Sequence, residues 1–271
     1  MRTLSYLPVL ALLTLLVGCP GRLTAAEAAE AVEESSIATQ SAALMGASIE
    51  ISTDFTIGGA VRDAAAEVRA AIESQLPCAE ITLEDATLTI EYGALPGYCS
   101  YRGHTFSGSH SIEVSRNEEA AVVVHHNWNE LSNGRVSVSG EAEVTWSRVE
   151  RSRHVVHELT WTRLRDGRVG VGSGDRTQRP LDGGISEGIG VDGSRTWDGE
   201  SGRWDLAIDG VEMRWADPVP QSGSWTLDTP FDKSLRLDFE RIDADTIGVT
   251  VTNARRSFEF RVNSVGAVSR R

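Results

Sequence analysis

The sequence predicts a mainly β protein, in which an antiparallel β-meander, shaped as an open barrel or a sandwich, follows one or two N-terminal helices. Two observations lead to this fold class. From residue 78 to 271 apolar residues recur at every second position in short runs, which is typical of half-buried strands. Asn-Gly and Asp-Gly pairs lie between such runs, and these dipeptides favour tight hairpins. Hairpins in succession imply antiparallel pairing, and a stretch of this length fits one β-domain.

The N-terminal segment has the features of a signal peptide. Arg2 provides a positive start, and the apolar run from Leu4 to Val17 is shorter than the roughly 20 residues that a spanning helix needs. The run ends in the sequence Leu-Val-Gly-Cys at residues 16–19, which resembles the lipobox of bacterial lipoproteins. The alternative is a secreted protein with a chance cysteine at this position.

The resemblance to a lipobox implies lipidation of Cys19. It implies export, cleavage of the signal peptide 1–18, and a thioether-linked lipid with acyl chains such as palmitate on Cys19. Pro20 stands where an Asp would favour retention at the inner membrane, so the outer membrane is the expected location. The expected membrane partner is therefore the lipid around these acyl chains, on the periplasmic or the surface face.

Two segments before the β-region have helical composition. Residues 19–57 carry the lipidated cysteine and are rich in Ala, Glu and Ser, which fits either a helix or a solvated tether. Residues 58–77 predict an amphipathic helix that Pro77 terminates and that packs on the following sheet. Its apolar face consists of Val61, Ala65, Val68 and Ile72.

The predicted strands come next in order along the chain. Side chains on one, mainly apolar, face are predicted at Leu88, Ile90 and Tyr92; at Val136, Val138, Ala142, Val144 and Trp146; and at Val155, His157, Leu159 and Trp161. Hairpin turns are predicted at Asn133-Gly134, Asp166-Gly167 and Asp209-Gly210. Ser-Gly pairs starting at Ser107, Ser139, Ser201 and Ser222 suggest further turns.

Cysteine usage predicts a single disulfide. With Cys19 lipidated, Cys78 and Cys99 remain as an even pair in an oxidising compartment. A metal or redox pair is the alternative, but neither CxxC spacing nor an adjacent histidine supports it.

The stretch from Leu88 to Val114 resembles a pattern of uncharacterised β-rich bacterial lipoproteins. Its marks are an alternating strand that ends in aromatic-Gly, then a Cys, a Gly, and a Ser-Gly that opens the next strand. These positions are Tyr92-Gly93, Cys99, Gly103 and Ser107-Gly108. The resemblance implies a β-rich fold and an envelope location, and it implies no activity.

The charge of the chain limits its partners. It carries 26 basic and 39 acidic residues, a net charge of −13, so nucleic acid is not an expected partner. No motif in the chain points to a cofactor.

Gly184-Ile-Ser-Glu-Gly188 matches GxSxG, but in hydrolases with this motif the histidine follows the serine. Here all six histidines precede Ser186, so a turn is expected. The histidines cluster between residues 104 and 157, which leaves a metal site from adjacent strands as an alternative. They are His104, His110, His125, His126, His154 and His157.

Two further patterns suggest ligands. Residues 183–193 look like a single glycine-aspartate calcium unit, so Asp192 and Asp198 are candidate calcium ligands in what is expected to be a flexible loop. The seven tryptophans all lie in the β-region, where an exposed row would bind sugars. Their phase places Trp146, Trp161, Trp204 and Trp215 toward the core or an apolar groove that could hold a lipid.

The function predicted from the sequence is that of a membrane-anchored cell-envelope lipoprotein without catalytic residues. It binds an apolar small molecule or an envelope ligand, or it has a structural role. The alternatives are a metal-dependent hydrolase that uses the histidines, which requires three of them to converge, and a carbohydrate-binding surface protein.

Overall fold

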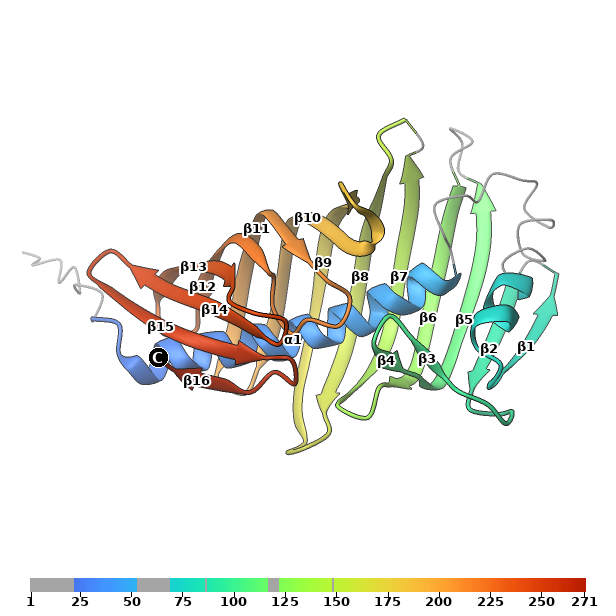
Figure 1. Ribbon diagram of the computed structural model, residues 1–271, viewed down its shortest axis with the longest axis horizontal. Coiled ribbons are helices and arrows are strands. Elements are labelled where there is room, and N and C mark those ends of the chain that lie inside the picture. The colour runs from blue at the N-terminus through green and yellow to red at the C-terminus, as the bar shows by residue number, and fades with distance from the viewer. Residues whose placement is uncertain (1–21, 53–68, 86, 117–121, 148) are drawn as a thin grey trace, which may run out of the picture.

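A computed structural model describes residues 22–52, 69–85, 87–116, 122–147 and 149–271 (Figure 1). It consists of one long helix and an antiparallel sheet of 14 strands in sequential order, and the predicted antiparallel meander is confirmed. The sheet is open, with β1 (Ala79–Glu84) and β16 (Val268–Arg270) at its two ends, and β3 (Ser100–Tyr101) and β4 (His104–Thr105) form a separate hairpin. Three predicted elements lie wholly or partly outside the described residues: the signal peptide, Cys19, and the predicted helix at Val61, Ala65 and Val68.

The elements have the following bounds. The helix is α1 (Ala25–Ser52). The strands of the first half are β1 (Ala79–Glu84), β2 (Thr87–Tyr92), β3 (Ser100–Tyr101), β4 (His104–Thr105), β5 (Ser107–Arg116), β6 (Val122–Ser132), β7 (Val136–Ser147) and β8 (Ser152–Arg163). Those of the second half are β9 (Arg168–Leu181), β10 (Gly184–Gly199), β11 (Gly202–Met213), β12 (Ser222–Thr229), β13 (Lys233–Arg241), β14 (Thr246–Asn253), β15 (Arg256–Asn263) and β16 (Val268–Arg270).

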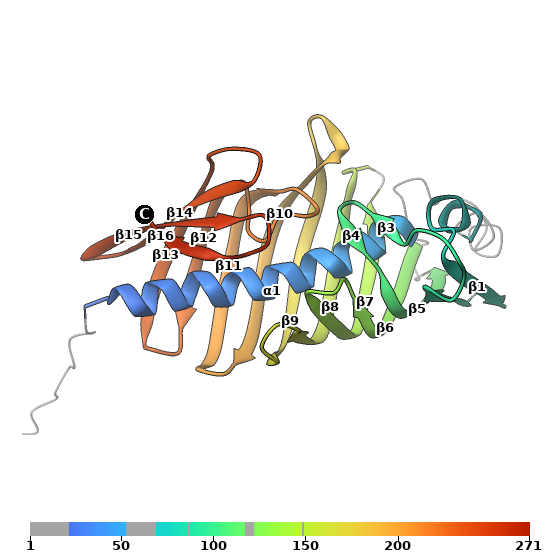
Figure 2. The same cartoon turned by 60° about the horizontal axis from the view of Figure 1, so that its bottom comes forward.

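The sheet curls around α1, which runs along its concave face (Figures 1 and 2). Twisted open sheets seldom exceed about 10 strands without curling. The helix packs against β7 and β8 on one side and against β14, β15 and β16 on the other. Two turns meet beside the helix, because the Arg135 guanidinium donates to the carbonyl of Ser264 at 3.1 Å. The concave face is therefore occupied by a segment of the chain itself.

Helix α1 begins where its sequence provides a capping box. The Glu27 amide donates to the Thr24 hydroxyl at 3.2 Å, and the Thr24 amide donates to the Glu27 carboxylate at 2.8 Å. Of the two alternatives for this segment, helix or solvated tether, the structure contains the helix over Ala25–Ser52. Its residues from 44 to 52 are all buried, as expected for a helix enclosed on every side.

Small residues make this enclosure feasible. Most of α1 is Ala, Ser and Gly, so the surrounding strands can approach its backbone. The buried hydroxyls of Ser41 and Ser48 donate to the helix carbonyls of Ile37 and Met45, at 3.1 and 2.8 Å. These bonds satisfy the hydroxyl donors, so the buried serines do not need acceptors on the sheet.

The second predicted helix is described only in its last part. Residues 69–75 are helical, and the chain then turns at Pro77. Ile72 and Leu76 are fully buried in the same core as the sheet. The predicted disulfide between Cys78 and Cys99 is confirmed, with a Cα–Cα distance of 5.4 Å, and it joins the start of β1 to the segment before β3.

Two loop predictions are wrong. Asp209-Gly210 forms a bulge inside β11 instead of a hairpin turn, because the strand pairing shifts there on both sides. Residues 184–199 form strand β10 instead of a flexible loop, although residues 185–188 interrupt its pairing with β9. In both places glycine permits a distorted strand as readily as a turn.

The Ser-Gly pairs at Ser107 and Ser222 open strands β5 and β12, whereas the pair at Ser139 lies inside β7. Gly140 has φ +138°, and a Cβ there would lie 2.2 Å from the Glu158 carbonyl oxygen of the next strand. Glycine is therefore needed at this position because the two strands lie close together and the backbone bends there, and no hairpin turn forms.

Candidate functional site

The interface between α1 and the concave face of the sheet contains an unusual number of buried polar side chains. Polar groups avoid such positions unless they are paired, so each needs an explanation. On the strands they are His110, His126, Arg153, His157, Arg176, Gln178 and Arg195. On the helix they include Thr39, Ser48 and Glu50.

Glycines on β9 create the space for this cluster. Gly170, Gly172 and Gly174 occupy alternate positions on the concave face, opposite large side chains of β8 and β10. A Cβ at Gly174 would lie 2.3 Å from His157 Cε1 and 2.9 Å from Arg195 Cγ. The pattern of glycine at every second residue is a sequence signal for this site that the periodicity of apolar residues does not reveal.

The histidines form a buried row across β5 and β6. The ring nitrogens His110 Nε2 and His126 Nδ1 lie 2.9 Å apart, and the Tyr92 hydroxyl lies 3.3 Å from His110 Nδ1. Burial lowers the pKa of His110 to about 3 and that of His126 well below its ordinary value. Both rings stack on Trp128, whose indole donates to the Ser48 hydroxyl of α1 at 2.9 Å. These neutral rings tie the sheet to the helix.

Arg153 forms the main charged contact between sheet and helix. Its guanidinium donates to the Glu50 carboxylate at 2.9 Å, and its Nε donates to Gln178 Oε1 at 2.5 Å. It also lies over the rings of Trp146 and Trp215, at 5.5 and 5.7 Å from their centroids. Both charges of this ion pair are buried.

Arg176 and Arg195 lack such a carboxylate. Arg195 donates to the carbonyl of Ala38 on α1 at 2.6 Å and lies over Trp197. Within the described part of the chain, neither arginine has an ion-pair partner, and Arg176 Nε and Nη2 are buried without a hydrogen bond. Burial lowers the pKa of both groups, to about 10 for Arg195, and the positive charge of Arg195 lowers that of Arg176 further.

A cavity of about 30 Å³ lies beside these two arginines, between α1 and strands β9 to β12. Since one water needs roughly 10–15 Å³ by this measure, the cavity has space for two or three water-sized groups. Its polar lining includes Thr39, Arg176, Gln178 and Arg195, and its apolar lining includes Val191, Ile208, Val211 and Trp225.

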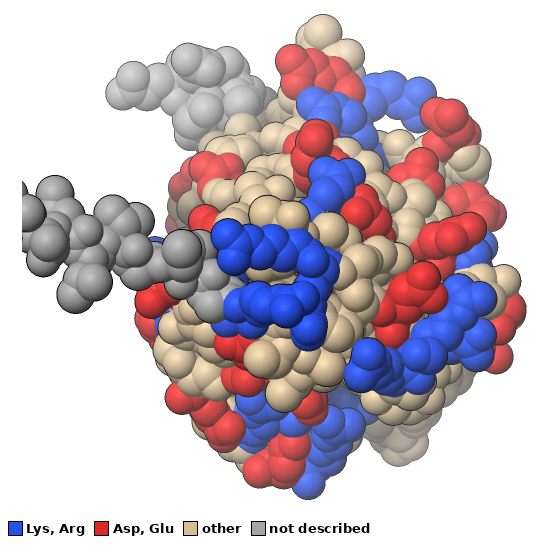
Figure 3. All heavy atoms as spheres, turned by 90° about the vertical axis from the view of Figure 1, so that its left-hand side faces the viewer, with Lys and Arg blue, Asp and Glu red and all other residues tan. Residues whose placement is uncertain are grey.

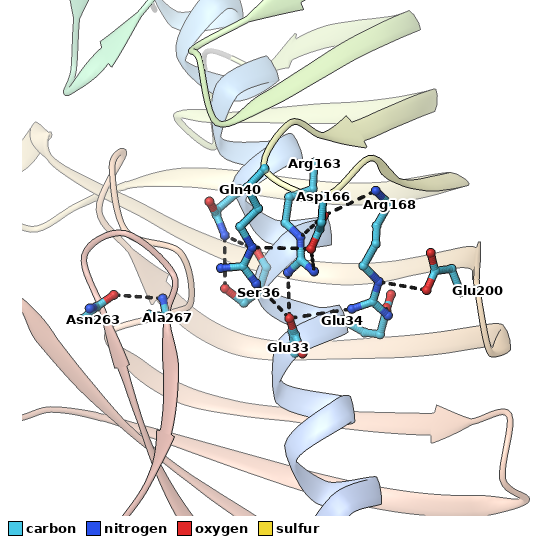
Figure 4. A network of polar contacts seen from close by, with 11 residues as sticks. Glu33, Glu34, Ser36, Gln40, Arg163, Asp166, Arg168, Glu200, Asn263 and Ala267 are labelled. Atoms are coloured by element: carbon cyan, nitrogen blue, oxygen red, sulfur yellow. Dashed lines mark hydrogen bonds and ion pairs between the residues drawn. The ribbon is translucent and has the colours of Figure 1, made fainter.

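A second polar cluster closes the helix against the β8–β9 hairpin (Figure 4). Glu33 accepts from Arg163 at 2.8 Å, and Glu34 accepts from Arg168. Burial raises the pKa of Glu34, and the charge of Arg168 opposes this rise. The cluster reaches solvent through Glu200 and Asp166, so it fixes the position of α1 at the rim of the interface.

The histidines are divided between the two faces of the sheet. His104 Nε2 lies 2.8 Å from the Trp215 carbonyl, whereas His125 and His154 lie on the outer face beside Glu143 and Asp175. No three His, Cys, Asp or Glu side chains of the described ranges lie close enough together to hold a metal ion. The convergence that the hydrolase hypothesis requires is therefore not seen in this part of the chain.

The remaining candidates from the sequence are the calcium ligand Asp192, Ser186 of the GxSxG motif and the tryptophans, and they do not form one site. The Asp192 carboxylate accepts from the Gly210 amide at 2.8 Å and from Arg179 at 3.3 Å, so its oxygens already have protein partners. Ser186 lies in the interrupted start of β10. All seven tryptophans are described and none is exposed, so they form no exposed row for sugars.

The outer face of the sheet carries two open depressions. One, of about 450 Å³, is lined by Glu113, Glu141, Glu143 and Glu158 together with His125. The other, of about 610 Å³, extends toward Asp198 and Arg203. Both are open to solvent. His126 and His157 also line the first, and His126 Nε2 and His157 Nδ1 are buried without a hydrogen-bond partner among the described residues, whereas no such atom lines the second.

Comparison with known proteins gave no relative: no family model, no curated protein and no solved structure matches the chain. In the described part of the chain, no helix is both long enough and apolar enough to cross a membrane.

Proposed function

We propose that the protein is a bacterial cell-envelope lipoprotein that is anchored through acyl chains on Cys19 and binds a small ligand between α1 and the sheet. The cavity beside Arg176 and Arg195 carries the binding part of this proposal, because buried polar groups there lack protein partners. A ligand that occupies the cavity would satisfy them. The role is binding, since the lining consists of fixed cations, amide and hydroxyl groups and apolar side chains.

The short distance between Cys19 and α1 supports the anchoring part. The helix begins at Ala25, only six residues after Cys19. Six extended residues span at most about 20 Å. An acylated Cys19 would therefore hold the N-terminal end of α1, and the strands packed on it, close to the bilayer surface.

The surface at that end fits this orientation. Figure 3 shows the end of the molecule where the described chain begins, and basic side chains gather there beside the grey atoms, among acidic ones. Arg22 lies at this end and is exposed. Basic side chains near a bilayer are attracted to anionic headgroups. With Pro20 after the cysteine, we place the anchor in the outer membrane.

A larger apolar ligand is the second candidate. The concave face that would hold it is filled by α1, so a lipid-sized molecule would have to displace the helix. Only a few large apolar side chains of α1, among them Val32, Leu44 and Ile49, contribute to the core. A structural role in the envelope is the remaining candidate, and it requires no ligand.

Cell fractionation tests the anchor. The wild-type protein is expected in the membrane fraction, and a Cys19→Ser variant is expected to leave it. An equal distribution of the two would contradict the proposal. The control is a Ser107→Ala variant, whose substitution lies on the sheet and which should stay in the membrane fraction like the wild type.

Native mass spectrometry of protein purified from its own cells tests the ligand. An additional mass that is lost on denaturation supports a binding role. A mass in the range of a lipid would favour the second candidate, in which a larger apolar ligand displaces α1. An acylated chain without any added mass, from a preparation that also shows no response to small anions, would contradict ligand binding and favour a structural role.

A further inference from the structure

We propose that the cavity between α1 and strands β9 to β12 binds a small monovalent anion, either a halide ion or the carboxylate end of a small molecule, between Arg176 and Arg195. This inference rests on the proposed function, because it names the chemical class of the ligand in the same cavity. It is independent of the lipid anchor.

The first argument is charge. Arg153, Arg176 and Arg195 are all nearly inaccessible to solvent, and Glu50 is paired with Arg153. No carboxylate of the described ranges pairs with Arg176 or Arg195. Arginine keeps its proton in proteins, so this site retains excess positive charge. A buried charge without a partner is costly, and a bound anion removes this cost.

The second argument is hydrogen bonding. Three residues that line the cavity carry buried polar atoms without a partner among the described residues: Arg176 at Nε and Nη2, Thr39 at its hydroxyl, and Trp225 at its indole nitrogen. The guanidinium and indole groups can only donate, and a hydroxyl can donate as well. A group that accepts several hydrogen bonds fits this lining, whereas a cation or an apolar group does not.

The third argument is size. A cavity of about 30 Å³ fits a monatomic anion or the two oxygens of a carboxylate. It does not have space for a nucleotide or an acyl chain. A carboxylate would also match the planar guanidinium of Arg176, which can donate two parallel hydrogen bonds. The apolar side chains of Val191, Ile208 and Val211 keep bulk water away from the bound ion.

Thermal unfolding of the full mature protein in detergent tests the site. The protein is unfolded, refolded in sodium isethionate, a sulfonate that carries no carboxylate and whose anion is too large for the cavity, and titrated with sodium chloride, bromide or formate at constant ionic strength. We expect Tm to rise by several degrees between about 1 and 100 mM of the small anion, because the anion binds the native state only. Equal Tm values in isethionate, chloride, bromide and formate would overturn the proposal.

Two variants assign the effect to the cavity. Arg176→Met keeps an unbranched apolar stem but removes the guanidinium with its charge and donors, so its Tm should not respond to the small anions and should equal or exceed that of the wild type in isethionate. Arg179→Met, at an exposed position of the same strand, should keep the wild-type response. A wild-type response in Arg176→Met would overturn the assignment.

A further variant and a direct observation cover the case that Arg176→Met does not fold. Thr39→Val removes one donor without changing charge and should weaken the response severalfold.

Crystals soaked in sodium bromide should show an anomalous peak within hydrogen-bond distance of Arg176, and a cavity without a peak contradicts the proposal. An organic mass retained in native spectra identifies a carboxylate as the source, whereas a Tm response without such a mass identifies a halide. If the protein is acylated and retains another ligand but fails every anion test, this inference is overturned and the proposed function is not.

Discussion

Arg153 of β8 and Glu50 of α1 form a buried ion pair with a nitrogen–oxygen distance of 2.9 Å. The two residues are 103 positions apart in the chain, so the contact joins the helix to the middle of the sheet. Because neither side chain reaches solvent, each charge depends on the interior of the protein for its compensation. The pair therefore holds α1 in one register along the concave face.

Removal of the Glu50 charge should be costly. In Glu50→Gln, Arg153 loses the carboxylate that compensates its charge, so we expect the free energy of unfolding to fall by about 3–5 kcal/mol. Urea unfolding measures the change. The control is Glu73→Gln, which removes an exposed pair with Arg69 and should cost at most about 0.5 kcal/mol. Equal effects in the two variants would contradict the account of the interface.

The glycines of β9 should not tolerate a methyl group. In Gly172→Ala the added Cβ would lie 2.3 Å from the Thr196 carbonyl oxygen and 2.6 Å from Trp197 Cβ. Because the backbone oxygen has little freedom to move, we expect a loss of about 1–3 kcal/mol in the free energy of unfolding. Gly190→Ala, whose added Cβ would lie 3.9 Å from the Arg179 carbonyl oxygen, is the matched control on β10 and should be close to neutral. A larger loss of stability in Gly190→Ala than in Gly172→Ala would contradict the proposed packing.

Stability should fall below neutral pH. Burial lowers the pKa of His104, His110, His126 and His157 in the folded state. The unfolded chain therefore binds protons near pH 6.5 that the folded chain does not, so stability is present above that pH and is lost as the pH falls toward the folded pKa values. Each histidine with a folded pKa below 5 should contribute a loss of about 2 kcal/mol between pH 7 and pH 5.

A histidine variant isolates this effect. His110→Phe keeps an aromatic ring against Trp128 but cannot take up a proton, so urea unfolding at pH 7 and pH 5 should differ by about 2 kcal/mol less than in the wild type. Ser109→Ala, a change on the same strand that removes no titratable group, should keep the wild-type pH dependence. An unchanged dependence in His110→Phe would show that this ring does not stay neutral in the fold.

The disulfide should stabilise the start of the sheet. Cys78 and Cys99 are separated by 21 residues, and a loop of this size implies about 3 kcal/mol from the lower entropy of the unfolded chain. The double variant Cys78→Ser with Cys99→Ser should lose about this amount in urea unfolding. Reduction of the wild type should produce a similar loss, whereas reduction of the double variant should have no effect.

Much of the fold can be predicted from the sequence because strand periodicity is local. Val155, His157, Leu159 and Trp161 alternate with polar residues, and all four are buried on the concave face. The Asn133-Gly134 and Asp166-Gly167 turns and the disulfide are also correct. The Asp209-Gly210 prediction fails because glycine serves bulges and turns alike, and which one forms depends on the pairing of neighbouring strands.

The candidate site could not be predicted in the same way. Its residues come from α1 and from strands β9 to β12, and only the curl of the sheet around the helix brings Thr39, Arg176 and Trp225 to one cavity. The helix itself was one of two alternatives for an Ala- and Ser-rich segment with few large apolar residues. Two signals were present in the sequence: the capping box of Thr24 and Glu27, and the glycine at every second residue of β9.

The mass of the mature N-terminal peptide tests the central claim, that this fold is attached to a membrane at Cys19. The account predicts a peptide that begins at Cys19 and carries a thioether-linked diacylglyceryl group, in protein purified from its own cells. An unmodified Cys19 within a longer peptide, or a mature chain that begins after Cys19, would contradict the account.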